Sequence, residues 1–377
     1  MKILLVSTLS HNPGDEFIRL GVEHLLRRVY PGSHLKVIHK HDGRTLFSGF
    51  QQRKKTPHRL IAPALYNVYA AVHGRNEENY LDSADLVVFA GTPFIWRTQV
   101  KLLRSTCANA EWVGATWRRL FRDLRDKPVF NLAAGSSATN STQVEGILAD
   151  RTIRNFLCRA LERTKLTTAR DEMTRSILGA LGFDVPMIPC ASLMAAKGAY
   201  LPAESPQYVA INIMESAAHN WRGQRGDPSK WKKTVTAAVE YIEKRHPILL
   251  VSHSADEDAT AANWFPKHPR VLSKDPIALL TTYSKAIYGV CNRVHAGAAV
   301  ASFGRPALVV GGDSRINLIK QFGLPAYDHR DLDGATLVEH IENLESDYAG
   351  YLQRLKECSE ATEQSYMRAI SVVKLGT

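Results

Sequence analysis

Short apolar runs alternate with amphipathic segments along most of the chain. Residues 3–7 form the first run, and after a polar turn at residues 11–15 apolar side chains recur at helical spacing over residues 18–29. Two further runs, at residues 86–90 and 129–133, each end at a small polar loop. Strands that alternate with helices indicate βαβ units, whose ligands bind at the carboxyl ends of the parallel strands.

The second half of the chain repeats this pattern after a break. Residues 197–207 contain two prolines and show no periodicity, which predicts a linker. Further strands are predicted at residues 208–213, 248–252, 286–291 and 307–310, a helix at residues 228–245, and helical structure from residue 335 to near the end.

We therefore predict an α/β fold of two Rossmann-like domains with a cleft between them. A length of 377 residues fits two domains better than one. The predicted parts are residues 1–198, residues 207–350, and a C-terminal helix, residues 351–377, that packs back on the body.

Composition narrows the class of protein. Apolar residues make up 45% of the chain and charged residues 23%, as in an ordinary globular protein. The first apolar run is too short for a signal peptide and no stretch is long enough to span a bilayer, so we expect a cytoplasmic protein. Five widely separated cysteines favour reduced thiols, and we predict no metal site.

The formal net charge of +11 favours anionic partners without selecting one. We find no zinc-finger spacing, RNP-like motif or helix-turn-helix, and expect no specific nucleic acid. Residues 117–127 would form a helix with Trp117 and Leu120 on one face and arginines on the other, which suits peripheral contact with the inner, anionic face of a membrane. The simpler interpretation of this segment is a solvated surface helix.

The first polar turn of the chain is a candidate anion site. Asn12, Gly14 and Asp15 join a strand to a helix, so backbone N–H groups at the helix N-terminus face the ligand-binding edge of the sheet. Asp15 is also a candidate N-cap. The alternative is a turn that only closes a βα connection.

Arg170 is the second candidate. It follows a short strand at residues 167–169 and precedes two acids that suit the first turn of a helix, which Gly182 would end. A guanidinium binds carboxylate or phosphate in a bidentate fork that lysine cannot copy. The alternative is a structural ion pair with Asp171.

His253 is the third candidate and stands beside an acidic cluster, residues 254–258. Because both follow a predicted strand, His253 or Asp256 could act as a base toward a substrate hydroxyl. Helix capping by Asp256 is the alternative.

The strongest motif is Arg293-Val294-His295, followed by the small residues 296–299. In an extended segment, side chains two apart lie on the same side, so Arg293 could fix an anion while His295 reaches its reacting atom. The small residues would let the following helix approach other elements closely. The alternative is a histidine whose ring only satisfies a backbone carbonyl.

These motifs, in this order, resemble the polysaccharide pyruvyl transferase family over most of the chain. The matching segments are Asn12-Pro13-Gly14-Asp15, Ala169-Arg170-Asp171, Arg293-Val294-His295-Ala296, where the family has leucine at the second place, and Gly311-Gly312-Asp313-Ser314-Arg315. The resemblance implies a glycosyltransferase-B-like fold. It also implies transfer of the enolpyruvyl carbons of phosphoenolpyruvate to sugar hydroxyls as a ketal, in the biosynthesis of cell-surface polysaccharides.

On this resemblance we expect no cofactor, with phosphoenolpyruvate as a co-substrate and a saccharide or lipid-linked saccharide as the acceptor. Residues 1–198 would form the acceptor side of the cleft and residues 207–350 the donor side. Arg170 and Arg293 would grip the donor from opposite domains as the cleft closes, and His295 would act as an acid and then a base. Arg315 would neutralise the leaving phosphate. The alternative function is a glycosyltransferase of the same fold that uses a nucleotide-sugar donor.

Overall fold

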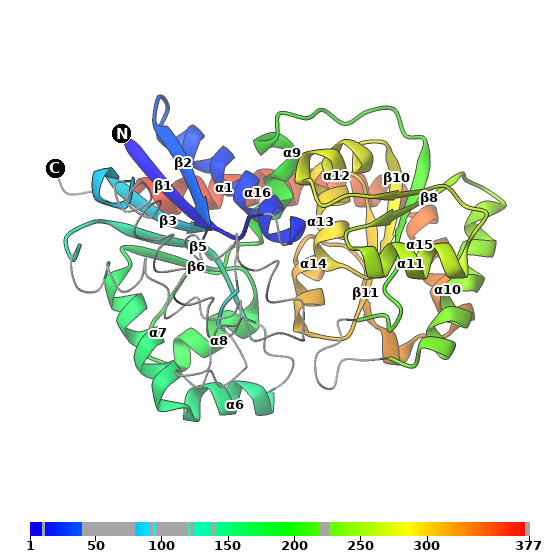
Figure 1. Cartoon of the computed structure of the whole chain (residues 1–377), viewed down its shortest axis with the longest axis horizontal. Coiled ribbons are helices and arrows are strands. Elements are labelled where there is room, and N and C mark those ends of the chain that lie inside the picture. Colours follow the sequence, from blue (N-terminus) through cyan, green and yellow to red (C-terminus); the bar gives the residue numbers. More distant parts are fainter. Residues whose placement is uncertain are drawn as a thin grey trace, which may run out of the picture.

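The chain is known from a computed structural model, which describes residues 1–9, 12–39, 80–90, 93–95, 120, 124–136, 141–218 and 226–373. Two α/β halves lie side by side, each around a six-stranded sheet (Figure 1). All strand pairs of the described residues are parallel. The two Rossmann-like, parallel-sheet halves confirm the predicted fold class.

The sheet of the first half has the order β2-β1-β3-β5-β4, with β6 beside β5. Its strands are β1 (Lys2–Ser7), β2 (His34–His39), β3 (Leu86–Ala90), β4 (Pro93–Ile95), β5 (Val129–Ser136) and β6 (Leu166–Ala169). The described long helices of this half are α1 (Pro13–Val29), α6 (Ser141–Ala149), α7 (Arg151–Arg163) and α8 (Glu172–Ala180).

Both faces of this first sheet are covered. Along β1, Ile3 and Leu5 belong to the apolar core that α1 shares, whereas Leu4 and Val6 belong to the core on the side of α6, α7 and α8. This alternation follows from the two-residue period of a strand, and a strand buried on both faces is apolar throughout. Such runs are therefore visible in the sequence.

The sheet of the second half has the order β12-β11-β10-β7-β8-β9. Its strands are β7 (Tyr208–Asn212), β8 (Ile248–Ser252), β9 (Arg270–Leu272), β10 (Ala286–Cys291), β11 (Ala307–Gly311) and β12 (Ala326–Asp328). Its helices are α10 (Pro228–Glu243), α11 (Ala255–Trp264), α12 (Pro276–Tyr283), α13 (Val294–Ser302), α14 (Asn317–Gln321), α15 (Gly334–Ser346) and the 3₁₀ helices η3 (Ser314–Ile316) and η4 (His329–Asp331).

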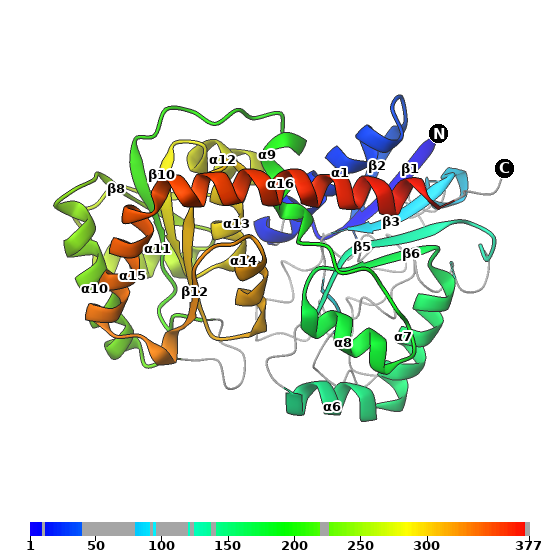
Figure 2. The same cartoon turned by 180° about the vertical axis from the view of Figure 1, so that it is seen from behind.

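The last helix, α16 (Tyr348–Ser371), starts at the second half and runs across both halves on the side that faces the viewer in Figure 2. Glu363 of this helix forms ion pairs with three basic side chains of the first half of the chain. The carboxylate oxygens lie 2.6 Å from Lys197 Nζ, 2.8 Å from His24 Nε2 and 2.9 Å from Arg28 Nη1. This ion-pair cluster fixes the C-terminal helix against α1.

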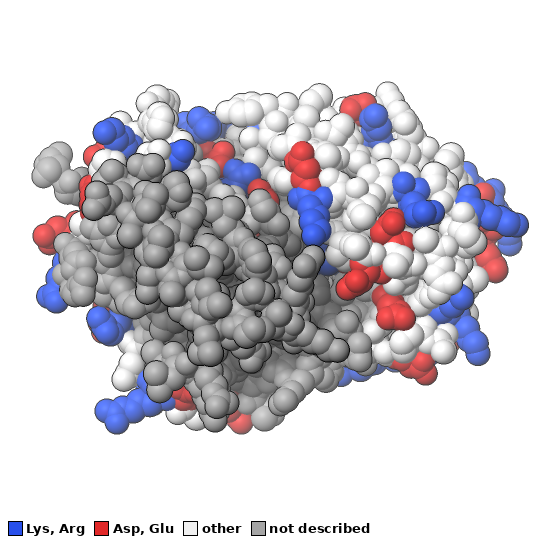
Figure 3. Space-filling view, in the orientation of Figure 1, with Lys and Arg blue, Asp and Glu red and all other residues white. Residues whose placement is uncertain are grey.

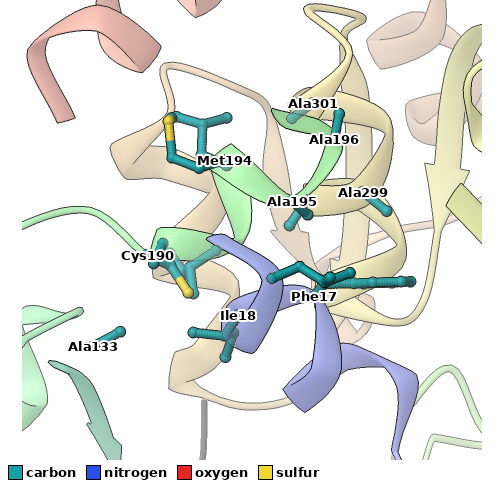
Figure 4. Close-up of a cluster of buried hydrophobic side chains, with 14 of the residues drawn as sticks. Phe17, Ile18, Ala133, Cys190, Met194, Ala195, Ala196, Ala299 and Ala301 are labelled. Atoms are coloured by element: carbon teal, nitrogen blue, oxygen red, sulfur yellow. The ribbon is translucent and has the colours of Figure 1, made fainter. Parts of the chain in front are cut away.

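A hydrophobic cluster continues from one half into the other. Helix α1 packs against the 3₁₀ helix η2 (Ala191–Met194), α9 (Ala195–Gly198) and α13. Figure 4 groups Phe17 and Ile18 of α1 with Ala195 and Ala299 in this cluster. A Cβ on Gly21 would lie only 1.8 Å from the Ala191 carbonyl oxygen, so glycine is required for this close approach.

None of the described helices is both long and apolar enough to cross a membrane. The segment 117–127 lies mostly outside the described residues. On the face seen in Figure 3, basic side chains of the second half are interspersed with acidic ones.

Candidate functional site

A pocket lies at the joint between the two halves. Its wall comes from the start of α1, the end of β8, the connection from β10 to α13 and the loop after β11. The lining residues are Asn12, Gly14, Ala218, His253, Asn292, Arg293, Val294, His295, Gly311, Gly312, Asp313, Arg315 and Ile316. Seven of the predicted site residues therefore share one pocket. Of the others, Asp15 accepts a hydrogen bond from the pocket residue Asn12, Arg170 is close enough to His295 to affect its pKa, and Asp256 is exposed.

The residues of the first half that line this pocket lie at the start of α1. Asn12 has an extended backbone and its Oδ1 accepts a hydrogen bond from Gly14 N at 3.1 Å, so Asn12 is the N-cap. The prediction that Asp15 is an N-cap is wrong, because proline at the first helical position places the cap at Asn12. Asp15 instead accepts a hydrogen bond from Asn12 Nδ2 at 3.2 Å.

Gly14 allows the two halves to touch at the site. A Cβ at this position would lie 2.6 Å from Nδ1 of His295, which belongs to α13 of the other half. Any larger side chain would have to displace the imidazole. The contact places the N-terminus of α1 directly beside the candidate acid–base residue.

The connection from β10 to α13 differs from its predicted form. Arg293 is the N-cap of α13, and Val294 and His295 form the first helical turn. The extended spacing that would place Arg293 and His295 on one side is therefore wrong. Both residues still line the pocket, because the chain turns into the helix there.

The buried carboxylate of Glu257 holds Arg293. Glu257 is 4% exposed and accepts hydrogen bonds from Arg293 Nε at 2.5 Å, from His253 N at 2.9 Å and from Asn212 Nδ2 at 3.0 Å. A second guanidinium nitrogen of Arg293 also contacts this carboxylate. Although burial opposes the charged form, Arg293 keeps the pKa of Glu257 below its usual value. Sequence reasoning missed this partner, because the acidic cluster gave no sign of which acid faces inward.

His253 is part of the buried wall of the pocket. Its Nε2 lies 2.8 Å from the Tyr283 hydroxyl, and its ring packs edge-on against Phe17 of α1. Burial, followed by the nearby charge of Arg293, lowers the pKa of His253 to about 3, so the ring is neutral at physiological pH. The predicted capping by Asp256 is wrong, since Ser254 caps α11 and Asp256 is exposed.

The guanidinium of Arg170 is held less closely by acidic side chains than those of Arg293 and Arg315. It is 1% exposed, and its Nε and Nη1 have no hydrogen-bond partner among the described residues. The Asp171 carboxylate is 3.9 Å from Nε and caps α8 through a 2.7 Å hydrogen bond from Thr174 N. The predicted ion pair with Asp171 is therefore present without a hydrogen bond. Buried guanidinium donors without hydrogen-bond partners are costly unless an anion binds them.

Arg315 is paired in a different manner. Its Nε and Nη2 donate to Asp313 at 2.9 and 2.6 Å, and the Asp313 carboxylate also caps η3. Burial alone would lower the pKa of Arg315, but Asp313 holds it above the usual value. Arg315 therefore stays charged but is largely neutralised by its neighbour.

His295 lies within the electrostatic reach of all these cations. Burial, Arg170 and Arg315, in that order, lower the pKa of His295 well below its usual value. Within the part of the chain that the structure describes, its Nε2 has no hydrogen-bond partner. The site thus presents a neutral imidazole whose Nε2 has no hydrogen-bond partner, near a guanidinium with two unsatisfied donors, an arrangement suited to binding an anion and moving a proton.

Fold and site together define a two-domain α/β protein of glycosyltransferase-B-like architecture with a guanidinium-rich pocket between its halves. Residues 12–314 match the model of the polysaccharide pyruvyl transferase family, which covers most of the chain, and the chain belongs to this family. No curated protein sequence matches the chain.

Solved structures show the fold at low sequence identity. The UDP-GlcNAc 2-epimerase of Neisseria meningitidis, bound to UDP-GlcNAc, is 11% identical with a TM-score of 0.55, over 98% of this chain and 99% of the epimerase. The UDP-N-acetylglucosamine 2-epimerase of Rickettsia bellii is 10% identical with a TM-score of 0.51, over 99% of this chain and 97% of that protein. At such identities the likeness concerns the fold alone.

Proposed function

We propose that this protein transfers a pyruvyl group from phosphoenolpyruvate to sugar hydroxyls, forming a ketal. The observation that carries the proposal is the buried guanidinium of Arg170, which has no hydrogen-bond partner at Nε and Nη1 among the described residues and is close enough to His295 to lower its pKa. Membership of the pyruvyl transferase family supports the same assignment. The acceptor in this proposal is a saccharide or lipid-linked saccharide of cell-surface polysaccharide biosynthesis, used at the cytoplasmic side of a membrane.

The donor carries a carboxylate and a phosphate. The cations of the site differ in how free their N–H groups are to bind these two anionic groups. Arg170 binds one of these groups in a bidentate fork, since its donors are not committed elsewhere. The N–H groups at the start of α1 and the charge of Arg315 complement the other group. Arg293, held by Glu257, has a smaller share in donor binding than its motif suggests.

The reaction forms two C–O bonds to C2 of the donor and breaks the C2–O bond to phosphate. One acceptor hydroxyl adds to C2, and the C3 methylene takes up a proton to become a methyl group. The second hydroxyl then replaces the phosphate, whose leaving oxygen receives the second hydroxyl proton. Two hydroxyl protons are lost and two are accepted, so no external acid or oxidant is required.

His295 handles the first of these protons in the proposal. Its depressed pKa favours a neutral imidazole at the start, so it accepts the hydroxyl proton before it protonates C3. This order is the reverse of the acid-then-base sequence expected from the motif alone. The negative charges of the bound donor raise the pKa of His295 and allow it to hold the proton in transit.

Phosphate release in the presence of phosphoenolpyruvate and a saccharide acceptor, followed by ³¹P NMR, tests the proposal. Wild-type protein should release phosphate with formation of a ketal. His295→Asn should lower the rate by roughly two to four powers of ten with an unchanged melting temperature. Near-normal turnover of this variant would remove His295 from the mechanism.

The second candidate is a nucleotide-sugar glycosyltransferase, because a neighbour of the same fold binds UDP-GlcNAc. A diphosphate would also be attracted to Arg170. The two candidates differ in which ligand raises the melting temperature, because a ligand that binds only the folded state stabilises it. We expect a rise with phosphoenolpyruvate, whereas a rise with UDP-GlcNAc alone would favour the second candidate.

A further inference from the structure

Strand β5 contains an irregularity next to the anion site. Its pairing with β6 passes from Asn131 opposite Thr167 to Ala134 opposite Ala169, so three steps along β5 match two along β6. The extra residue is a β-bulge, a feature that re-aims the strand that follows it. Within the bulge, Ala133 has a φ of 56°, in the left-handed region that alanine rarely adopts.

The side chain of Thr168 stabilises this bulge. The bulge takes the Ala133 N–H out of the regular ladder, and the N–H donates instead to Thr168 Oγ1 at 2.9 Å. Thr168 and Ala133 are both fully buried. A buried N–H left without an acceptor is destabilising, so the threonine hydroxyl offsets part of the cost of the left-handed conformation.

The bulge determines which residue of β5 lies under the Arg170 guanidinium. Beyond it, the Ala134 carbonyl accepts a hydrogen bond from Arg170 N at 2.9 Å. A Cβ on Gly135 would lie 2.3 Å from Arg170 Nε. Without the extra residue, the next part of β5 would turn its other face to Arg170, since a one-residue slip exchanges the faces of a strand.

The geometry points to Thr168 as a positioning residue for the anion site: its hydroxyl holds the Ala133 bulge, and the bulge places Gly135 beneath the Arg170 guanidinium. Thr168 does not line the pocket, and it acts through Arg170. This inference rests on the proposed role of Arg170 in binding the donor.

The test compares Thr168→Val, which keeps the shape but removes the hydroxyl, with Thr168→Ser, which keeps the hydroxyl. Thr168→Val should raise the KM for phosphoenolpyruvate about tenfold or more, the scale of one buried hydrogen bond, while kcat changes by less than about threefold. Thr168→Ser should stay within about threefold of wild type. Equal KM values for wild type and Thr168→Val would overturn the inference.

A double variant distinguishes positioning from a general packing defect. Glycine tolerates a positive φ, so Ala133→Gly added to Thr168→Val should recover most of the lost donor affinity. Failure of this rescue, with Thr168→Ser also impaired, would assign Thr168 to packing alone. If Thr168→Val does not fold, Thr168→Ala, which leaves room for a water on the Ala133 N–H, takes its place in the same comparison.

A crystal structure of Thr168→Val tests the positioning role of Thr168 without relying on catalysis. The Arg170 guanidinium should move away from Gly135, and inorganic phosphate should stabilise this variant less than wild type. An unmoved guanidinium would overturn the positioning role whatever the reaction is. Absence of pyruvyl transfer by wild type, with Arg170 still displaced in the variant, would instead overturn the proposed function alone.

Discussion

At the scale of single residues, Arg170 and Arg293 differ in what holds their guanidinium groups. Glu257 pairs with Arg293, whereas Nε and Nη1 of Arg170 find no hydrogen-bond partner among the described residues. Removing one partner of a buried ion pair leaves an uncompensated charge, while removing an unpaired buried charge relieves a cost. The two arginines should therefore have opposite effects on stability.

We predict that Arg170→Met leaves the free energy of unfolding unchanged or raises it, while anion binding is lost. Arg293→Met, the matched control, should lower the free energy of unfolding by about 3 kcal/mol, because Glu257 is left without its cation. Urea denaturation measures both values. Strong destabilisation by Arg170→Met would indicate a structural partner for its guanidinium.

The buried His253 makes stability depend on pH. Its pKa is lowered to about 3 in the folded protein from an ordinary value of 6.5. Between these values the unfolded chain binds a proton that the folded chain does not, so stability falls as the pH drops below 6.5 toward 3.

On lowering the pH from 7.5 to 5, wild type should lose about 2 kcal/mol more than His253→Gln, at about 1.4 kcal/mol per pH unit below the unfolded pKa. Glutamine retains a hydrogen-bonding group near Tyr283 without titrating. Chemical denaturation at the two pH values gives the comparison. Equal losses in the two proteins would show that His253 is not buried in its neutral form.

At the scale of elements, the site depends on two helix N-termini that meet closely. Helix α1 contributes Gly14 and helix α13 contributes His295, and a Cβ on Gly14 would lie within 2.6 to 2.9 Å of three atoms of that imidazole. A methyl group there must displace the ring, because contacts under 3 Å are repulsive.

Gly14→Ala should therefore lower kcat by about tenfold or more through misplacement of His295. Gly146→Ala in α6 is the matched control, because a Cβ there meets no atom within 4 Å and alanine favours the helix. This control should keep full activity with equal or greater stability. Normal kcat in Gly14→Ala would show that the imidazole position is not critical.

Strands buried on both faces could be predicted from the sequence, whereas most edge strands could not, and the short edge strand β6 is an exception. The apolar runs of β1, β3, β8 and β10 matched their strands to within a residue. Strands β2, β9 and β12 lie at sheet edges and carry polar residues, so their hydrophobic signal is weak. Helical structure was predicted from residue 335 on, but the chain forms two helices there, and Asp347 separates them.

The candidate site was predictable in its residue types and less so in its geometry. Motif order identified seven residues that line one pocket, because strand ends of a parallel sheet gather at one edge. The pairing of Glu257 with Arg293 and the bulge at Ala133 depend on tertiary contacts between distant segments. The local sequence pattern contains no information about such contacts.

At the scale of the whole molecule, the two halves pack against each other through apolar side chains, and the pocket lies at the edge of this contact. Helices α1, α9 and α13 pack through small residues, and the Glu363 ion pairs fix α16 to α1 and α9. The site residues of the two halves are in contact in this arrangement, with Gly14 against His295. Large closure is therefore not needed to bring Gly14 and His295 together.

The central claim is that the guanidinium of Arg170 binds an anionic group of phosphoenolpyruvate beside His295. A crystal structure with phosphoenolpyruvate bound tests it most directly. We predict the carboxylate or phosphate within hydrogen-bond distance of Arg170 Nε or Nη1, with C3 facing His295 Nε2. Phosphoenolpyruvate bound elsewhere on the molecule, with Arg170 and His295 untouched, would contradict the account.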